Sequence, residues 1–401
     1  MQSAALLWHV SLLVPAEKRA LALGLMGLVR VGPVVVFSLI SGVAADTFDR
    51  RRLMLVTQSI MAVLAGVLAV LTLGGLSVAW PVYALSACSS AAGAFDLPAR
   101  QALVPTLVPR QHLPNALTLN TIMVQIASVA GPALGGLAIA LSGVGWVYVI
   151  NAISYTAVVA ALLMMNPDRA RRPGAELDEG TSDLTLRSAL EGLRFVFRAP
   201  LIRSTMLLDF FATFFSSATA LLPIFAQDVL HVGARGYGWL FAAPAAGAVI
   251  TSAIMIGAVE RIEYRGRILI GAILVYGLAT VGFGISRVFA ISFVCLALTG
   301  AADTVSTVFR NLIRQLETPD RLRGRMVGVN MVFFLGGPQL GELEAGLVAA
   351  WRGPVFSVVS GGIGCVAVTL WIAGITPMLR AYRRTAVPVI VDRTGEGRPS
   401  E

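Results

Sequence analysis

The sequence has little charge and few of the residues that carry catalysis or metal binding. Only 13% of its 401 residues are Asp, Glu, Lys or Arg, about half the share of an ordinary soluble domain. Its three histidines and three cysteines are scattered, without the spacing of a metal site, a disulfide framework or an activated nucleophile. It also lacks the phosphate-binding loop of ATP-driven pumps. We therefore expect no enzyme, no catalytic residues, no metal and no cofactor.

The sequence is instead rich in apolar residues. Hydrophobic residues make up 56% of the chain, and the mean hydropathy is +0.79. A helix needs about 20 apolar residues to cross the hydrocarbon core of a bilayer. Roughly eleven runs of this length occur, from residues 21–44 to residues 355–375. The sequence predicts an all-α protein that spans the lipid bilayer many times.

The chain opens with a shorter apolar stretch, from Ala4 to Val14, which is too short to cross a bilayer unaided. Two explanations compete: the true start lies upstream of Met1, or the protein has lost half of its first helix. We expect the first, because an uncovered bundle face would leave lipid in the wall of a cavity.

The two halves of the chain resemble each other. Residues 100–120 and 310–330 are basic segments of equal length between long apolar runs, and a second similarity pairs the segments that begin at Gly42 and Gly257. Such parallel repeats are typical of transporters that place a substrate site between two rocking halves.

We predict two six-helix bundles related by pseudo-twofold symmetry, with a truncated first helix. Residues 1–165 form the first transmembrane bundle and residues 201–380 the second. A cytoplasmic linker at 166–200 joins them, and a disordered cytoplasmic tail follows at 381–401.

The net charge of +9 does not indicate nucleic-acid binding, because the basic residues lie in short loops and no aromatic-rich polar domain is available to bind bases.

By the positive-inside rule we assign alternate loops and the C-terminus to the cytoplasm. Arg310 and Arg314 are counted among these loop residues. The other side then holds only Lys18, Arg19, Arg235, Arg287 and Arg352.

A charged cluster closes the second apolar run, with Gly42, Asp46, Arg50 and Arg51 in one short stretch. A carboxylate at a helix end can bind an arginine and face a neighbouring helix N-terminus in one conformation only. The cluster is therefore a candidate conformational latch. The alternative is a solvated charged loop.

The fifth apolar run carries a glycine–proline motif, formed by Gly131, Pro132, Gly135 and Gly136. Glycines one turn apart let two helices approach closely, and a proline frees a carbonyl and permits a bend. Ordinary packing of small residues in a membrane is the alternative interpretation.

Five passages together resemble a known family: GVAADTFDRRRLMLVTQ, FDLPARQALVPTLVPRQHLPNALTLN, GPALGGLAIA, ALLPIFAQDVL and LGELEAGLVA. They are similar to transporters of the major facilitator superfamily, in the bacterial branch of the enterobactin exporter and related drug-efflux proteins. The resemblance implies that Asp46 and Arg50 stabilise an outward-open state, and that the glycine–proline motif marks an exporter. The sequence departs from the family pattern at Thr47 and Asp49. The uncharged stretch 79–94 also lacks the arginine-bearing proton motif of many antiporters.

Charged residues inside the predicted spans are candidate proton or substrate sites, because each costs about 2.5–3.5 kcal/mol to insert. They are Arg30, Asp209, Asp303, Glu342 and Glu344. The resemblance implies that the second and eleventh helices pack together, so we expect Arg30 to pair with one of the two glutamates. Asp209 and Asp303 are either proton sites or polar helix–helix contacts.

The sequence and the resemblance predict a secondary active exporter of a small amphipathic molecule, either a siderophore or a drug-like compound. It would work by alternating access with H+ as the coupling ion, as a monomer in the bacterial cytoplasmic (inner) membrane. The alternative is a transporter-like sensor or assembly partner, or an inactive truncated copy.

Overall fold

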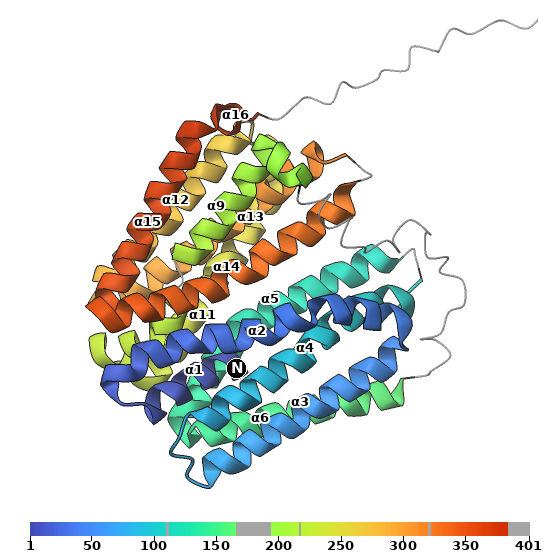
Figure 1. Cartoon of the computed structure of the whole chain (residues 1–401), viewed down its shortest axis with the longest axis vertical. Coiled ribbons are helices and arrows are strands. Elements are labelled where there is room, and N and C mark those ends of the chain that lie inside the picture. The colour runs from blue at the N-terminus through green and yellow to red at the C-terminus, as the bar shows by residue number, and fades with distance from the viewer. Residues whose placement is uncertain (110–111, 166–193, 216–217, 320–321, 384–401) are drawn as a thin grey trace, which may run out of the picture.

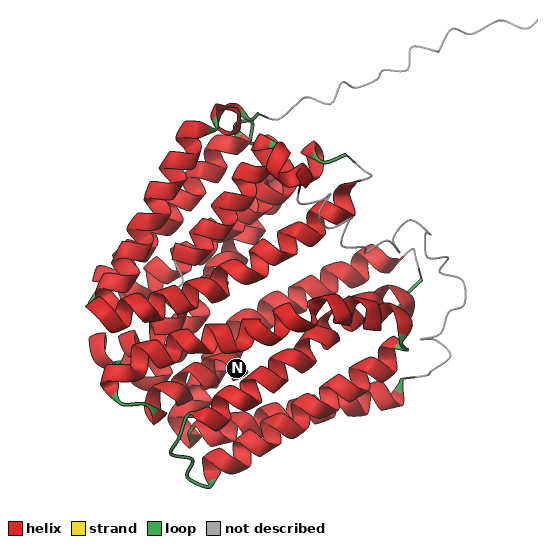
Figure 2. Ribbon diagram, viewed as in Figure 1, coloured by secondary structure: helices red, strands yellow, loops and turns green. Residues whose placement is uncertain are grey.

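The structure is a computed structural model of the chain. It describes residues 1–109, 112–165, 194–215, 218–319 and 322–383 (Figure 1). Within these ranges the regular elements are helices (Figure 2), so the predicted all-α fold is confirmed. The tail beyond residue 383 and most of the predicted linker lie outside the described residues.

The first half of the chain begins with a short helix followed by five long ones: α1 (Gln2–Leu13), α2 (Ala16–Thr47), α3 (Arg50–Leu73), α4 (Trp80–Leu107), α5 (Leu113–Ser142) and α6 (Val144–Met164). The helix α1 has 12 residues, fewer than a full span needs.

The second half contains a broken span and five further long helices. The broken span, Pro200–Val229, consists of α9 (Pro200–Phe215), the 3-10 helix η2 (Ala218–Leu221), α10 (Leu222–Ile224) and the π-helix η3 (Phe225–Val229). The helices that follow are α11 (Gly233–Ala258), η4 (Val259–Arg261), α12 (Arg265–Ile285), α13 (Phe289–Glu317), α14 (Arg323–Arg352), α15 (Pro354–Ile375) and α16 (Pro377–Ala381).

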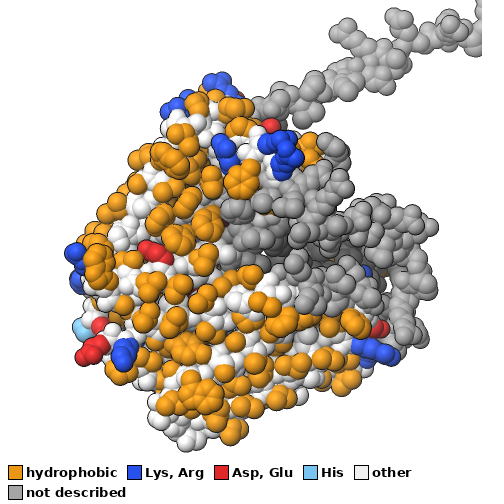
Figure 3. Space-filling model, viewed as in Figure 1, with side chains coloured by type: hydrophobic (Ala, Val, Ile, Leu, Met, Phe, Trp, Pro, Cys, Tyr) orange, Lys and Arg blue, Asp and Glu red, His pale blue; other side chains and the backbone are white. Residues whose placement is uncertain are grey.

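Eight helices in the described residues are long and apolar enough to cross a membrane. Hydrophobic side chains cover most of the visible face of the molecule, and Lys and Arg lie mainly near the margins of that face (Figure 3). This is the surface expected of a protein that sits in a bilayer, since lipid tails offer no partner for charge.

The helices form two groups that follow the two halves of the sequence. The helix α3 packs against α4 and α6 in the first group, and α12 packs against α13 and α15 in the second. The groups meet chiefly through two helix pairs, α2 with α14 and α5 with α11, and α1 adds smaller contacts with α10 and α11. In Figure 1, α2 and α14 lie close together where α1 turns into α2 and diverge toward their opposite ends.

Glycines make both of these contacts possible. A Cβ atom on Gly24 would lie 2.8 Å from the Cα of Gly346, and one on Gly136 would lie 2.4 Å from the Cα of Gly238. The two backbones therefore touch directly in each pair, as small-residue interfaces in membranes allow. Gly136 and Gly346 occupy equivalent positions in the repeat.

The turns after α5 and α14 also repeat. Each turns at one glycine, Gly143 with φ 85° and Gly353 with φ 92°, in the region that favours residues without a Cβ. Gly143 and Gly353 are separated by the same number of residues as Arg100 and Arg310, which begin the two repeated segments. The sequence repeat is therefore also a repeat of local backbone structure.

The glycine contacts predict that one added methyl group destabilises the protein at Gly346 but not at Gly66. Gly346→Ala places a Cβ 2.5 Å from the Cα of Gly24, so we expect a loss of about 1–3 kcal/mol of stability from overpacking. Gly66→Ala is the matched control in α3, where a Cβ meets nothing within 4 Å. The control should keep or raise stability, because alanine favours helix. Thermal unfolding in detergent measures both, and equal unfolding temperatures for the two variants would contradict the close contact.

Candidate functional site

A buried cluster of charges lies inside the second group of helices. Arg310 and Arg314 stand one turn apart on α13, each 2% exposed, and Asp209 on α9 is 3% exposed. The carboxylate of Asp209 lies 2.9 Å from Nη1 of Arg310 and 3.3 Å from Nη2 of Arg314. One carboxylate is thus held between two guanidinium groups.

The remaining donors of these arginines are largely occupied as well. Nε of Arg314 donates to the hydroxyl of Thr205 at 3.2 Å, Nη2 to its carbonyl oxygen at 3.0 Å, and Nη1 to Asn330. Arg310 donates to Thr307 at 2.7 Å. Buried ions are tolerated when hydrogen bonds replace their lost water in this way.

Asp303 has a different environment, although it lies on the same helix. Its carboxylate is 3.4 Å from Nη2 of Arg310, and its side chain is 49% exposed. Asp303 also lines a partly open cavity of about 140 Å³. Hydroxyl groups line much of this cavity, from Thr213, Thr219, Tyr276, Thr280 and Thr299. The volume suits water or a small ion and is well below the roughly 300–1,000 Å³ of a pocket for a drug-sized molecule.

The cluster corrects one assignment made from the sequence. The positive-inside rule placed Arg310 and Arg314 in a cytoplasmic loop, whereas both lie within α13 and are buried. Their partner Asp209 is about a hundred residues away in the chain, so hydropathy alone gives no sign of it. The spacing of four residues, which puts two side chains on one helix face, was the available signal.

The first half holds a smaller polar cluster that the sequence analysis missed. Asp96 on α4 is 4% exposed and accepts hydrogen bonds from Thr57 at 3.1 Å, Gln58 at 2.8 Å and Arg100 at 2.6 Å. The predicted span ended just before Asp96, but α4 continues to Leu107. Asp96 and Arg100, four residues apart, could have been recognised as a pair on one helix face.

Arg30 and Glu342 lie on α2 and α14, the two helices that pack together between the groups. The carboxylate of Glu342 lies against Gly27, one turn before Arg30 on α2, and the two charges interact electrostatically. The direct hydrogen bond of Arg30 goes to Ser3 on α1, at 3.3 Å. Oε2 of Glu342 is buried and accepts no hydrogen bond from the described residues. A direct pair between Arg30 and Glu342 stays a prediction.

Glu344 is less buried than Glu342. Two residues turn a helix by about 200°, so the two glutamates point to different sides of α14. Glu342 is therefore the candidate for the partner of Arg30.

The glycine–proline motif lies at the contact between the two groups. Besides the approach of Gly136 to Gly238, a Cβ on Gly131 or Gly135 would lie 3.3–3.4 Å from backbone atoms of Met1. The motif thus borders both α1 and α11. Pro132 lies inside α5, and its carbonyl oxygen is 3.0 Å from the Cβ position of Gly238.

The predicted latch is described only in part. The surroundings of Gly42 and of the Asp46 side chain lie outside what the structure describes. Nε of Arg51 donates to the carbonyl oxygen of Leu162 at 2.7 Å, and Nη2 donates to that of Leu163 at 3.0 Å. Arg51 thereby satisfies free carbonyls at the end of α6, where a cation is favourable.

Further contacts join the two halves near α1. Nη1 of Arg19 donates to both carboxylate oxygens of Asp228, at 3.1 and 2.9 Å. Gln227 donates to Ser11 at 2.8 Å, and the hydroxyl of Tyr237 donates to the carbonyl oxygen of Ala4 at 2.8 Å. Together with the glycine contacts, they close this end of the molecule.

Among the described residues, no group of His, Cys, Asp and Glu side chains could hold a metal ion. The functional groups that the structure brings together are ion pairs, hydroxyls and a small polar cavity. Charged groups inside membrane spans cost free energy to bury, so these groups are candidate functional sites.

A family profile described as "Transmembrane secretion effector" (MFS_3) matches residues 1–386. The chain belongs to the major facilitator superfamily. Its curated relatives include the enterobactin exporter EntS of Shigella boydii, 27% identical over 378 residues, with 94% of this chain and 86% of the relative covered. EntS of Escherichia coli O127:H6 is 27% identical over 382 residues with the same coverage. The resemblance inferred from the sequence is thereby confirmed.

Solved structures show the same fold. A POT family transporter in complex with a thioalcohol-conjugated peptide superposes with a TM-score of 0.71 at 10% identity, covering 94% of this chain and 93% of the other. The nucleoside transporter NupG gives 0.64 at 13% identity, covering 94% and 96%. The protein is a multi-pass membrane transporter, and its relatives argue against an enzymatic activity.

The charge cluster predicts unequal roles for its two aspartates. Asp209→Asn leaves Arg310 and Arg314 buried with a neutral partner, so we expect a loss of about 3–5 kcal/mol of stability. Asp303→Asn should cost much less, because that side chain opens onto a cavity and makes one contact at 3.4 Å. Thermal unfolding in detergent compares the two variants. Equal destabilisation would show that Asp209 is not the anchor.

Proposed function

We propose that this transporter is a secondary active exporter of a small amphipathic molecule, a siderophore or a drug-like compound, in the bacterial inner membrane. The observation that carries the proposal is the similarity to enterobactin exporters along 94% of the chain. The glycine–proline motif supports the direction of transport, because it resembles the motif that is characteristic of exporters in this superfamily. The arginine-rich helix ends and the C-terminus face the cytoplasm in this proposal.

Export is tested in cells that lack their own siderophore exporter. We expect expression of the transporter to restore enterobactin secretion or to lower the accumulation of at least one fluorescent drug-like dye. A Gly136→Leu variant, which cannot pack α5 against α11, is the inactive control. Uptake rather than efflux, or no transport of any compound at normal expression, would contradict the proposal.

Alternating access would use the closed end near α1 as the outer gate. Every contact between the halves described above lies toward this end, while α2 and α14 diverge toward the other (Figure 1). The structure then represents a state closed to the outside. The pair of Arg19 and Asp228 crosses the gate, so it would form in this state and break when the gate opens.

Charge exchange across the gate tests this role. Arg19→Asp or Asp228→Arg should open the outer gate about two- to five-fold more often, the effect of losing a partly exposed ion pair. The double exchange should restore the wild-type level. A cysteine at Ala4, which is 1% exposed, reports opening through labelling by an impermeant maleimide from outside. Arg235→Asp, an exposed change on the same side, is the control, and equal labelling in all variants would contradict the gate.

Proton coupling, the other part of the proposal, is best supported at Asp303. Coupling requires a carboxylate that gains and loses a proton during the cycle. Asp209 is held between two arginines, whereas Asp303 opens onto a cavity that can hold water. We infer that Asp303 carries the proton and that Asp209 fixes the arginines around it.

Amide substitutions separate these roles in a transport assay. When the lumen of everted vesicles is acidic, export from the cytoplasmic side is measured as substrate uptake into the vesicles. Asp303→Asn should reduce this uptake to the rate measured without the gradient, because the amide cannot bind the proton. Glu344→Gln, a matched change on another helix, should keep its response to the gradient. The assay uses everted vesicles with and without a protonophore. An unchanged response in the amide variants of Asp209, Asp303, Glu342 and Glu344 would remove the proton hypothesis.

A further inference from the structure

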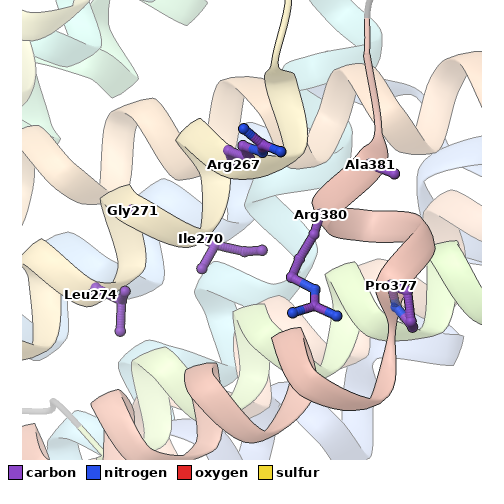
Figure 4. Close-up of a pocket in the computed structure, with 7 residues that line it drawn as sticks. All are labelled: Arg267, Ile270, Gly271, Leu274, Pro377, Arg380 and Ala381. Atoms are coloured by element: carbon purple, nitrogen blue, oxygen red, sulfur yellow. The ribbon is translucent and has the colours of Figure 1, made fainter.

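An open groove of about 510 Å³ lies at one end of the second group of helices, outside the polar cluster described above. One wall is the first part of α12, with Arg267, Ile270 and Leu274. The other wall is the short helix α16, with Pro377 and Arg380. Figure 4 shows the two arginines on opposite walls and the apolar side chains further along α12.

The walls of the groove are held together by backbone contacts. The N–H of Gly266 donates to the carbonyl oxygen of Tyr382 at 3.2 Å. A Cβ on Gly266 would collide with the carbonyl of Leu379, so the start of α12 and the end of α16 touch directly. The groove is therefore a preformed feature of the fold.

The charged side chains that line the groove are both positive. Within the described part of the chain, no ion pair joins Arg267 or Arg380 to an acidic residue. Arg267 stacks on the ring of Tyr264 at 5.0 Å, and Arg383 lies over the same ring at 4.6 Å. Two guanidinium groups, those of Arg267 and Arg380, thus line the groove, and they attract an anion with several oxygen acceptors.

The apolar wall indicates what kind of anion fits. Ile270 and Leu274 belong to a helix that crosses the membrane, so the groove runs from the polar end of α12 toward the hydrocarbon core. A soluble anion would use the arginines alone. A phospholipid would place its phosphate on the arginines and an acyl chain along Ile270 and Leu274, as basic pockets between membrane helices do.

We propose that the groove between α12 and α16 binds an anionic phospholipid, with Arg267 and Arg380 on the headgroup phosphate. In the proposed orientation the site faces the inner leaflet, but the recognition itself depends only on the geometry of the groove. It is separate from the charge cluster at Asp209 and from the contacts between the halves. If the groove does not bind a phospholipid, the proposed export function is therefore unaffected.

The test uses the purified full-length transporter in neutral detergent, titrated with phosphatidylglycerol or with phosphatidylcholine of the same acyl chains. Native mass spectrometry counts the bound lipids. We expect the wild-type protein to bind phosphatidylglycerol more tightly than phosphatidylcholine. The double variant Arg267→Gln/Arg380→Gln should lose about thirty-fold in affinity for phosphatidylglycerol, on the basis of about 1 kcal/mol for each cation.

The matched control is Arg203→Gln, which removes an exposed arginine from α9 and leaves the groove intact. It should bind phosphatidylglycerol like the wild-type protein. Equal affinity of the wild-type protein for the two lipids, or an equal loss in the control, would overturn the proposal. The variant Arg267→Lys/Arg380→Lys should stay within a few-fold of the wild type, because it keeps both charges.

A second variant distinguishes a lipid from a soluble anion. Leu274→Trp fills the apolar wall and keeps both arginines, so it should weaken phosphatidylglycerol binding. Unchanged binding in this variant, or displacement of the lipid by millimolar inorganic phosphate, would identify a soluble-anion site and contradict the lipid proposal. If the double glutamine variant does not fold, the lipid preference of the wild type and the Leu274→Trp variant still decide the question.

Discussion

The direct contact of glycine backbones between the two halves is the constraint on which this architecture depends. In a bilayer the hydrophobic effect does not drive helices together, because lipid tails are as apolar as the side chains they would replace. Close approach and the dispersion energy that it brings must hold the halves instead. Gly24 with Gly346 and Gly136 with Gly238 provide this approach at one end. The helix α1, the glycine–proline motif and the ion pair of Arg19 lie at the same end.

Charge inside the membrane follows a second constraint, since each buried ion must find its partners within the protein. Asp209 meets this demand with two arginines, and Asp96 meets it with Thr57, Gln58 and Arg100. Both clusters fix helices of one half against each other. Asp303 and Glu342 are less completely satisfied, which makes these two side chains the better candidates for a change of protonation or partner.

Much of the fold could be predicted from the sequence, because spans in a bilayer leave a direct record in hydropathy and the repeat relates one half to the other. The glycine–proline motif likewise indicated a close helix contact. The charged sites were harder to predict. In the sequence, Arg310 and Arg314 look like arginines of a cytoplasmic loop. Only the folded structure shows that they are buried beside Asp209. The partners of Gly136 and Arg19 lie in the other half, and no spacing within one segment identifies them.

The closed end has a consequence for how the transporter responds to its surroundings. The pair of Arg19 and Asp228 is an ion pair among the contacts described for this end, and Asp228 is about half exposed. Dissolved salt weakens such exposed pairs, whereas it has no comparable effect on glycine backbones in contact or on a tyrosine bound to a carbonyl. The contacts at this end of the molecule should therefore keep most of their strength when the salt concentration changes.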